Sequence, residues 1–240
     1  MRLPATPAIV FEWMFSRCTT SGRLRMSCWP ICAGVLAILG IVNAQAPTTR
    51  DLPLRGGRFQ PLSYDQMTPD QKKLVESILS GPRTSLDGPF NVLLRSPEMG
   101  DLAQKFGAYA RFHSSLPPRL NEMAILITGR FWTAQFEWQA HHRNALAVGL
   151  SPAIIDAIAS GKRPSPMQPD EKAVYNFCTE ILNNRHVSDA TFQAAKDKFG
   201  ERGVVDMLAV VGYYQFVSML LNTDEYPLPP GVQPELKPLR

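Results

Sequence analysis

Residues 117–150 read PPRLNEMAILITGRFWTAQFEWQAHHRNALAVGL. Two prolines open this stretch, and proline is favoured in the first turn of a helix because the N–H that it lacks has no helical partner there. The apolar spacing that follows predicts one helix from residue 117 to about residue 132. A second helix is expected from residue 134 to about residue 148, because Gly149 is a typical C′ residue.

Similar start and stop signals surround this stretch. Thr68-Pro69-Asp70-Gln71 supplies an N-cap, a first-turn proline and a capping-box partner, so a helix is predicted to begin there and to end before Gly81-Pro82. Further helices are expected over 97–112, 151–159, from 169, 188–199 and 201–222. No strand-like alternation competes with them, so the sequence predicts an all-α domain over residues 68–223.

The last predicted helix, 201–222, is apolar on nearly all sides in its middle. Its continuous apolar run is shorter than 18 residues and is interrupted by Asp206 and Gln215. A helix of this kind must be buried all round. We therefore expect it to be the central core helix or a subunit interface, rather than a membrane span.

The beginning of the chain has the pattern of an export signal. Residues 1–30 contain four arginines and one acidic residue, an apolar run covers 31–42, and small residues precede Ala44 and Ala46. This pattern predicts a signal peptide over 1–44 with cleavage after Ala44, and hence a periplasmic or secreted protein with no stable membrane insertion after cleavage. An uncleaved membrane anchor is the alternative reading, and Met14 and Met26 are alternative starts.

Two proline-rich segments flank the helical domain. Residues 45–67 show no sustained periodicity and are expected to form an extended arm. Residues 224–240 have the same character, and this tail either wraps over a neighbouring subunit or is disordered.

Removal of the leader changes both the charge and the cysteine content. Cleavage would take away four of the 25 basic residues and one of the 21 acidic ones, which leaves a nearly neutral protein without a basic patch for nucleic acid. Cys178 would be the only thiol left, so neither an internal disulfide nor a Cys-x-x-Cys pair is possible. Its apolar helical context favours a buried small hydrophobe over a reactive thiol.

The predicted helix over 134–148 brings an acid and an imidazole together. Ala134, Glu137 and His141 are three and four residues apart and therefore share one helical face. A carboxylate one turn before an imidazole can support its charged form and help it to move a proton near neutral pH. Glu122 would approach the same place if the two helices form an antiparallel hairpin. The competing interpretation is an ordinary surface pair.

Other side chains near this face are candidates for substrate binding. Trp132 and Trp138 are expected either to pack in the core or to wall an aromatic pocket, and His142 lies about a third of a turn from His141. Arg130 is a candidate for binding an anionic group, as are two further arginines at 119 and 143. No metal site is predicted, because adjacent histidines do not face one ion and no third ligand accompanies Glu137 and His141.

The spacing of these residues resembles a known family signature. The run Glu137-Trp138-x-x-His141-x-x-x-Ala145-x-x-x-Gly149-Leu150, preceded by Leu120-x-Glu122-x-x-Ile125-Leu126, is similar to that of the carboxymuconolactone decarboxylase family, which includes the alkylhydroperoxidase-D-like proteins. The resemblance implies an all-α, alkylhydroperoxidase-D-like fold that assembles as a trimer or hexamer.

The family that this sequence resembles has two branches with different chemistry. The peroxidase branch of the family uses two cysteines, and their positions are occupied here by Ala134 and Glu137, so that route is closed unless Cys178 substitutes for them. The decarboxylase branch has the Glu-Trp-x-x-His run. It implies a cofactor-free lyase acting on a small carboxylated lactone, with His141 exchanging a proton, Glu137 and Glu122 orienting or tuning it, and an arginine binding a carboxylate.

The sequence is therefore compatible with three functions. The first is a cofactor-free acid/base lyase, and the second is a peroxiredoxin-like antioxidant. The third is a non-catalytic oligomeric protein that binds small molecules on the same scaffold.

Overall fold

A computed structural model describes residues 52–83 and 85–238. The predicted signal peptide over 1–44 lies outside these residues. The described part contains eight α-helices, one 3-10 helix and no strand, which confirms the predicted all-α class. The elements, in chain order, are η1 (Tyr64–Gln66), α1 (Pro69–Leu79), α2 (Phe90–Leu93), α3 (Pro97–Phe112), α4 (Pro118–Phe131), α5 (Gln135–Ala147), α6 (Pro152–Ala159), α7 (Pro169–Asn184) and α8 (Asp189–Asp224).

The start of α1 shows how closely local sequence sets the helix ends. The side chain of Thr68 accepts a hydrogen bond from the backbone N–H of Gln71, and the Gln71 side chain accepts one from the backbone N–H of Thr68. This reciprocal pair satisfies two donors that the first turn of a helix leaves without partners. The predicted capping box is therefore present.

The two helices predicted at the C-terminal end of the domain are joined in α8. Gly200 interrupts the helical dihedrals with φ 66° and ψ 177°, and helix continues on both sides of it. A positive φ is readily adopted by glycine because it has no Cβ. Gly200 therefore provides the kink between the segments that the sequence predicts as separate helices. The short helices α2 and η1 were not predicted.

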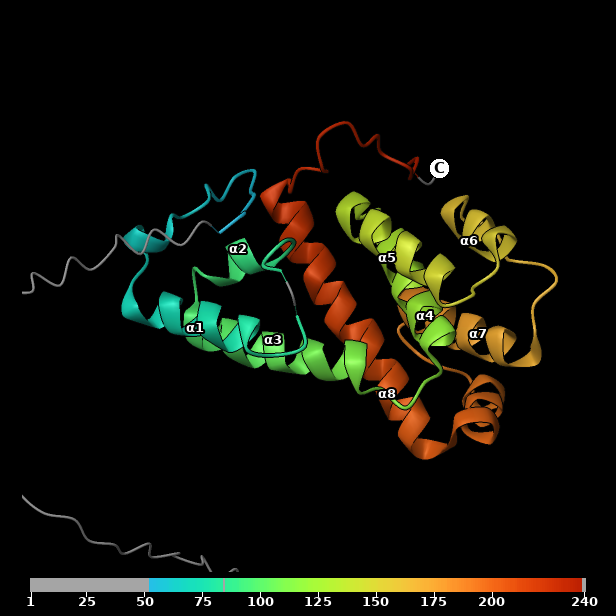
Figure 1. The fold of residues 1–240 in the computed structure, drawn as a ribbon. Coiled ribbons are helices and arrows are strands. Elements are labelled where there is room, and N and C mark those ends of the chain that lie inside the picture. Colours follow the sequence, from blue (N-terminus) through green and yellow to red (C-terminus); the bar gives the residue numbers. More distant parts are fainter. Residues whose placement is uncertain (1–51, 84, 239–240) are drawn as a thin grey trace, which may run out of the picture. The chain divides into compact units, whose positions relative to one another are not determined.

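The long helix α8 organises the domain. Figure 1 shows α8 between α1, α2 and α3 on one side and the group of α4 to α7 on the other. Its apolar residues enter two cores: Val210 and Val217 pack in the cluster with α4 and α7, whereas Phe216 and Leu220 contact the cluster built by α1 and α2. The central position predicted for this helix agrees with this arrangement. Its expected burial on all sides is wrong for the single chain, because Val205, Leu208 and Met219 are exposed.

The helix α8 is long and strongly apolar. Within the described residues, it is the one helix long and apolar enough to cross a membrane, with a mean hydropathy of 1.7 over an 18-residue stretch, of which 56 % is buried. The core helix of a soluble protein passes the same test, so these properties are only a weak indication of a membrane span.

Both flanking segments are attached to the helical domain. The carboxylate of Asp224 accepts hydrogen bonds from the backbone N–H groups of Gly57 and Phe59, which fastens the N-terminal arm to the end of α8. In the C-terminal tail, Leu236 is buried, and its backbone N–H and C=O both bond to the side chain of Gln135 on α5. The described part of the tail therefore packs on its own chain.

Candidate functional site

The helices α4 and α5 form an antiparallel hairpin. Thr133 in the connection adopts a left-handed conformation, with φ 49°, and the backbone N–H of Ala134 bonds to the carbonyl of Gly129. Next to the turn, Gly129 lies against Trp138. On α4, two turns before Gly129, Glu122 faces His141 of α5.

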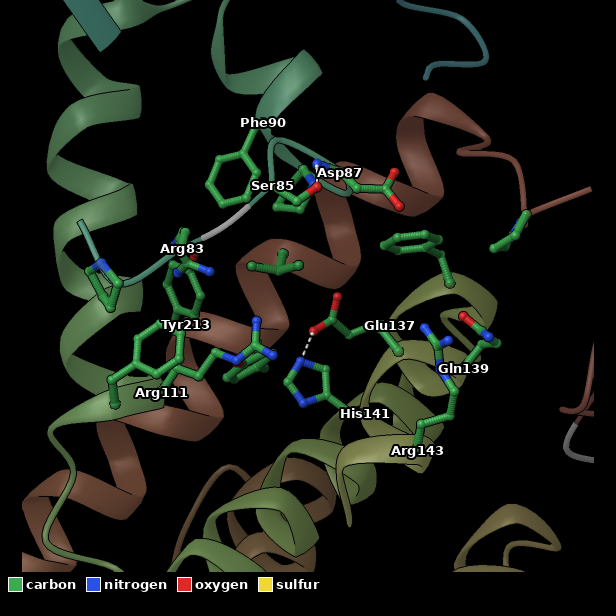
Figure 2. A pocket seen from close by; sticks show the side chains of 18 residues that line it. Arg83, Ser85, Asp87, Phe90, Arg111, Glu137, Gln139, His141, Arg143 and Tyr213 are labelled. Atoms are coloured by element: carbon green, nitrogen blue, oxygen red, sulfur yellow. Dashed lines mark hydrogen bonds and ion pairs between the residues drawn. The ribbon is translucent and has the colours of Figure 1, made fainter. Parts of the chain in front are cut away.

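Glu122, His141 and Glu137 form a buried triad. His141 Nδ1 lies 2.6 Å from Glu122 Oε2, and His141 Nε2 lies 3.0 Å from Glu137 Oε1. All three residues are buried. The contact between Glu137 and His141 is drawn in Figure 2. The pair predicted on one face of α5 is thus enclosed by protein and is not a surface pair.

The two carboxylates control the protonation of His141. Burial by itself lowers the pKa of the imidazole, but the negative charge of Glu122 and then that of Glu137 outweigh it, and hydrogen bonds to both add to the effect. The net result is a pKa of about 9 for His141. The ring is therefore a cation at neutral pH, with each N–H directed at a carboxylate oxygen.

Two tyrosines of α8 enclose the triad from the other side. The ring of Tyr214 meets the ring of His141 nearly at right angles, at 81°, with centroids 5.0 Å apart. Tyr213 packs edge-on against Tyr214 at 5.3 Å. Burial raises the pKa of both phenols, so both stay neutral near pH 7. They line the cavity as rigid aromatic walls with a polar edge.

The triad opens into a cavity of about 360 Å³. Glu137 and His141 contribute to its lining, together with residues of the 82–89 loop, the end of α3, α8 and Pro229 of the tail. This volume falls at the small end of the range typical for ligand pockets. The cavity can therefore hold a small organic molecule in contact with the acid/base pair.

Three arginines line the same cavity. Arg83 comes from the loop after α1, Arg111 from the last turn of α3 and Arg143 from α5. In Figure 2, Arg83 and Arg111 approach from the side of α3, whereas Arg143 projects from α5 beyond Glu137 and His141. Arginine binds carboxylates through two parallel hydrogen bonds, so the lining suits an anionic ligand.

Several polar atoms in this lining have no protein partner. Nε and Nη2 of Arg83 and Oε1 of Gln139 are buried without a hydrogen bond. Stacking on the rings of Phe90 and Phe112 holds the Arg83 guanidinium at 5.0 and 5.7 Å. Buried donors and acceptors are normally paired, so these atoms mark places where a ligand or water would bind.

Asp87, one of the two acidic residues in the lining, is already paired with an arginine outside it. Asp87 accepts two hydrogen bonds from Arg55, at 3.1 and 2.5 Å, and a third from the hydroxyl of Tyr226. Its charge is therefore compensated from outside the cavity. The three arginines leave the lining with an excess of positive charge.

The four residues proposed from sequence as substrate-binding lie outside this cavity. Trp138 is fully buried and donates its indole N–H to Glu235, which also contacts Nδ1 of His142 at 2.6 Å. Trp132 packs edge-on against its neighbour Phe131. Arg130 lines a different cavity. The sequence-based site thus comes together at Glu122, Glu137 and His141 but not at these four positions.

Of the two other arginines proposed from sequence, only one lines the cavity. Arg143 reaches the cavity, whereas Arg119 is paired with Asp170 and Glu171, at 2.5 and 2.8 Å, and holds α4 to the start of α7. Arg83 and Arg111 were not among the sequence candidates. No local signal could have singled them out, because they lie in a loop and at a helix end far from Glu137 in the chain.

Neither a metal cluster nor a reactive thiol is found in the described part of the chain. Between residues 52 and 238, residue 84 excepted, no group of three or more His, Cys, Asp or Glu side chains could hold a metal ion. Cys178, the one cysteine in that range, is completely buried, and burial raises the pKa of its thiol to about 12. A thiolate at this position is therefore strongly disfavoured near neutral pH.

Comparison with known proteins gives no assignment: neither a scan against models of protein families nor a search of curated proteins finds a match.

Proposed function

We propose that this protein is a cofactor-free acid/base carboxy-lyase that acts on a small carboxylated, lactone-like compound. The observation that supports this proposal most directly is the buried Glu122–His141–Glu137 triad, which opens into an arginine-lined cavity. An imidazolium between two carboxylates can supply a proton, and arginines can hold carboxylates. A decarboxylation needs both functions.

The bond changes fit these residues. An arginine binds a carboxylate of the substrate, and a second arginine on another wall can bind a further one. The C–C bond to the departing carboxylate breaks and its electron pair moves into the conjugated lactone carbonyl, which forms an enolate and releases carbon dioxide. The carbon that carried the departing carboxylate then takes a proton, and the enolate collapses to the neutral lactone. Positive charge held in a sheltered cavity stabilises the enolate.

The protonation step is assigned to the pair of His141 and Glu137. With a pKa of about 9, His141 holds a proton at neutral pH and serves as the acid rather than the base. Its Nε2–H points at Oε1 of Glu137, and both residues line the cavity. Glu122 contacts Nδ1 from the side of α4 and fixes the ring orientation, so we assign it a positioning role.

The fold within the all-α class is also part of the proposal. The motif around Glu137 and His141 supports an alkylhydroperoxidase-D-like domain that forms a trimer or hexamer after export to the periplasm or the medium. The surface of the single chain is consistent with assembly, because α3 and α8 expose large apolar side chains, foremost Leu102 at 66 % and Val205 at 62 % exposure.

The two other functions predict different behaviour. A peroxidase would require an accessible thiolate, and the burial of Cys178 opposes that role. A binding protein would keep the cavity and the arginines but would not depend on the protonation of His141. The binding protein is therefore the alternative that an experiment must separate from the lyase.

His141→Gln provides this separation. Wild type and variant are incubated with a pool of small carboxylated lactones, and the release of carbon dioxide is measured. Loss of a positioned proton donor should lower turnover by about 10²-fold or more. Light scattering and circular dichroism establish that the variant still folds and assembles. Turnover by His141→Gln equal to that of the wild type rules out His141 as the proton donor. Ligand binding without turnover by either protein rules out the lyase and identifies a binding function.

A further inference from the structure

Arg130 is a buried cation without a counterion. It lies at the end of α4 with 4 % of its surface exposed. Its Nη2 donates to the carbonyl of Lys237 at 2.7 Å and its Nη1 to the hydroxyl of Thr133 at 3.3 Å. Its Nε is buried without an acceptor, and no carboxylate of the described residues forms an ion pair with it.

This arrangement is physically incomplete. The two acceptors of Arg130 are a carbonyl and a hydroxyl, neither of which carries a negative charge. Burial lowers the pKa of Arg130, yet a guanidinium still keeps its proton in a protein. A buried charge is strongly unfavourable unless it is paired and fully hydrogen-bonded. An anion that reached Nε would supply both the missing negative charge and the missing hydrogen-bond acceptor.

Arg130 lines a separate cavity that could hold such an anion. It has a volume of about 180 Å³, lies between α4, α6 and α7, and shares no lining residue with the His141 cavity. Besides Arg130, Lys162 supplies positive charge, and Tyr175, Thr179 and Asn183 supply polar groups. The apolar part of the lining comes from Ile127, Phe131, Ile158 and Leu182.

We propose that this cavity is a second ligand site, which binds a small monocarboxylate with a short hydrocarbon chain. The carboxylate neutralises Arg130 and accepts a hydrogen bond from its Nε, with Lys162 at the rim. The hydrocarbon chain lies against Ile158 and Leu182. At half the volume of the His141 cavity, the site selects a smaller anion than the proposed substrate. This proposal does not depend on the lyase function.

Butyrate is a suitable probe, with butyramide as its uncharged analogue. Calorimetric titration of the wild type with butyrate should give saturable binding, and butyramide should not bind. Arg130→Gln should weaken the binding of butyrate at least about tenfold, because a charged hydrogen bond is lost. Arg202→Gln, at an exposed arginine of α8, is the matched control and should leave the affinity unchanged.

The His141 cavity also contains arginines, so the location of the bound anion must be measured. Crystals soaked in 4-bromobutyrate should show an anomalous bromine peak between α6 and α7. Thr179→Met, which fills the cavity without changing Arg130, should remove this peak and leave any peak near His141 in place. Circular dichroism verifies that both variants fold. Absence of saturable butyrate binding in the wild type, or an affinity for butyrate that Arg130→Gln leaves unchanged, overturns the proposal.

Discussion

Nδ1 of His141 on α5 lies 2.6 Å from Oε2 of Glu122 on α4, although 19 positions separate the two residues in the chain. Glu137 then contacts the other ring nitrogen from within α5. The helix hairpin therefore places one carboxylate on each side of the imidazole. The protonation of His141, and with it the proposed chemistry, depends on both contacts.

Glu122→Gln should change the pH dependence of the reaction. The substitution removes one of the two charges that raise the pKa of His141, so this pKa should fall from about 9 by roughly one unit or more. A reaction that uses the imidazolium as acid should then decline at lower pH than in the wild type. NMR titration of the His141 ring and the pH–rate profile measure the two effects. Glu235→Gln, which changes the contacts of this residue to His142 and Trp138 but leaves the triad intact, is the control.

Stability should also depend on the charge of His141. Its pKa is about 9 in the folded protein, against 6.5 for an unperturbed imidazole, so the folded state binds the proton more tightly. The resulting stabilisation is complete below pH 6.5, is lost as the pH rises to 9, and amounts to roughly 3 kcal/mol at most. Urea unfolding at pH 6, 7.5 and 9 should show the advantage of wild type over His141→Gln shrinking with pH. A constant difference would show that the pKa is not raised.

Arg111→Gln should weaken substrate binding. Arg111 lines the cavity but touches neither Glu122 nor Glu137 in a hydrogen bond, so its loss should raise KM by about tenfold or more with a smaller effect on kcat. Steady-state kinetics with the carboxylated substrate gives both constants. Arg119→Gln, whose arginine is engaged with α7, should reduce stability without raising KM. A KM unchanged by Arg111→Gln would contradict an anionic substrate in this cavity.

Leu236→Ala should loosen the C-terminal tail. Leu236 is buried against the main core, and truncating a buried leucine destabilises a protein by about 2–5 kcal/mol, with the low end expected for a tail that can move. Denaturant unfolding measures the loss, and quenching of tryptophan fluorescence by acrylamide should increase as Glu235 leaves Trp138. The exposed Pro238 offers the control Pro238→Ala, which should leave both measurements within error.

Cys178 should be unreactive in the native protein. Its complete burial and its pKa of about 12 predict that a thiol reagent labels it only after unfolding. The experiment uses a chain in which Cys18, Cys28 and Cys32 are replaced by serine. Rapid labelling under native conditions, or hydroperoxide turnover that Cys178→Ser abolishes, would restore the peroxidase interpretation.

The residues of the triad could be found from sequence because their signal is local. Glu137 and His141 share a helical face through their spacing, and the position of Glu122 follows once α4 and α5 pair as a hairpin. The arginine lining has no such signal. Arg83 lies in a loop and Arg111 in the last turn of α3, and tertiary packing brings both to the cavity that Glu137 and His141 line.

His141 and its neighbour His142 illustrate the same limit. The helical period places them about a third of a turn apart but does not say what either meets. In the structure, His141 turns toward Glu122 inside the domain, whereas His142 faces Glu235 of the tail. Arg130 and Trp138 are taken up by tail contacts as well, which no pattern within α4 or α5 indicates.

Local sequence patterns were enough to predict the all-α class, most helix ends and the pairing of Glu137 with His141, because capping, proline placement and the 3.6-residue period act over a few neighbouring residues. Which arginines reach the His141 cavity, and the place of Arg130 in a cavity of its own, became known only from the packing of the helices. Those outcomes depend on how α3, α8 and the tail pack against the α4–α5 hairpin, and such contacts join residues too far apart in the chain for any local pattern to specify.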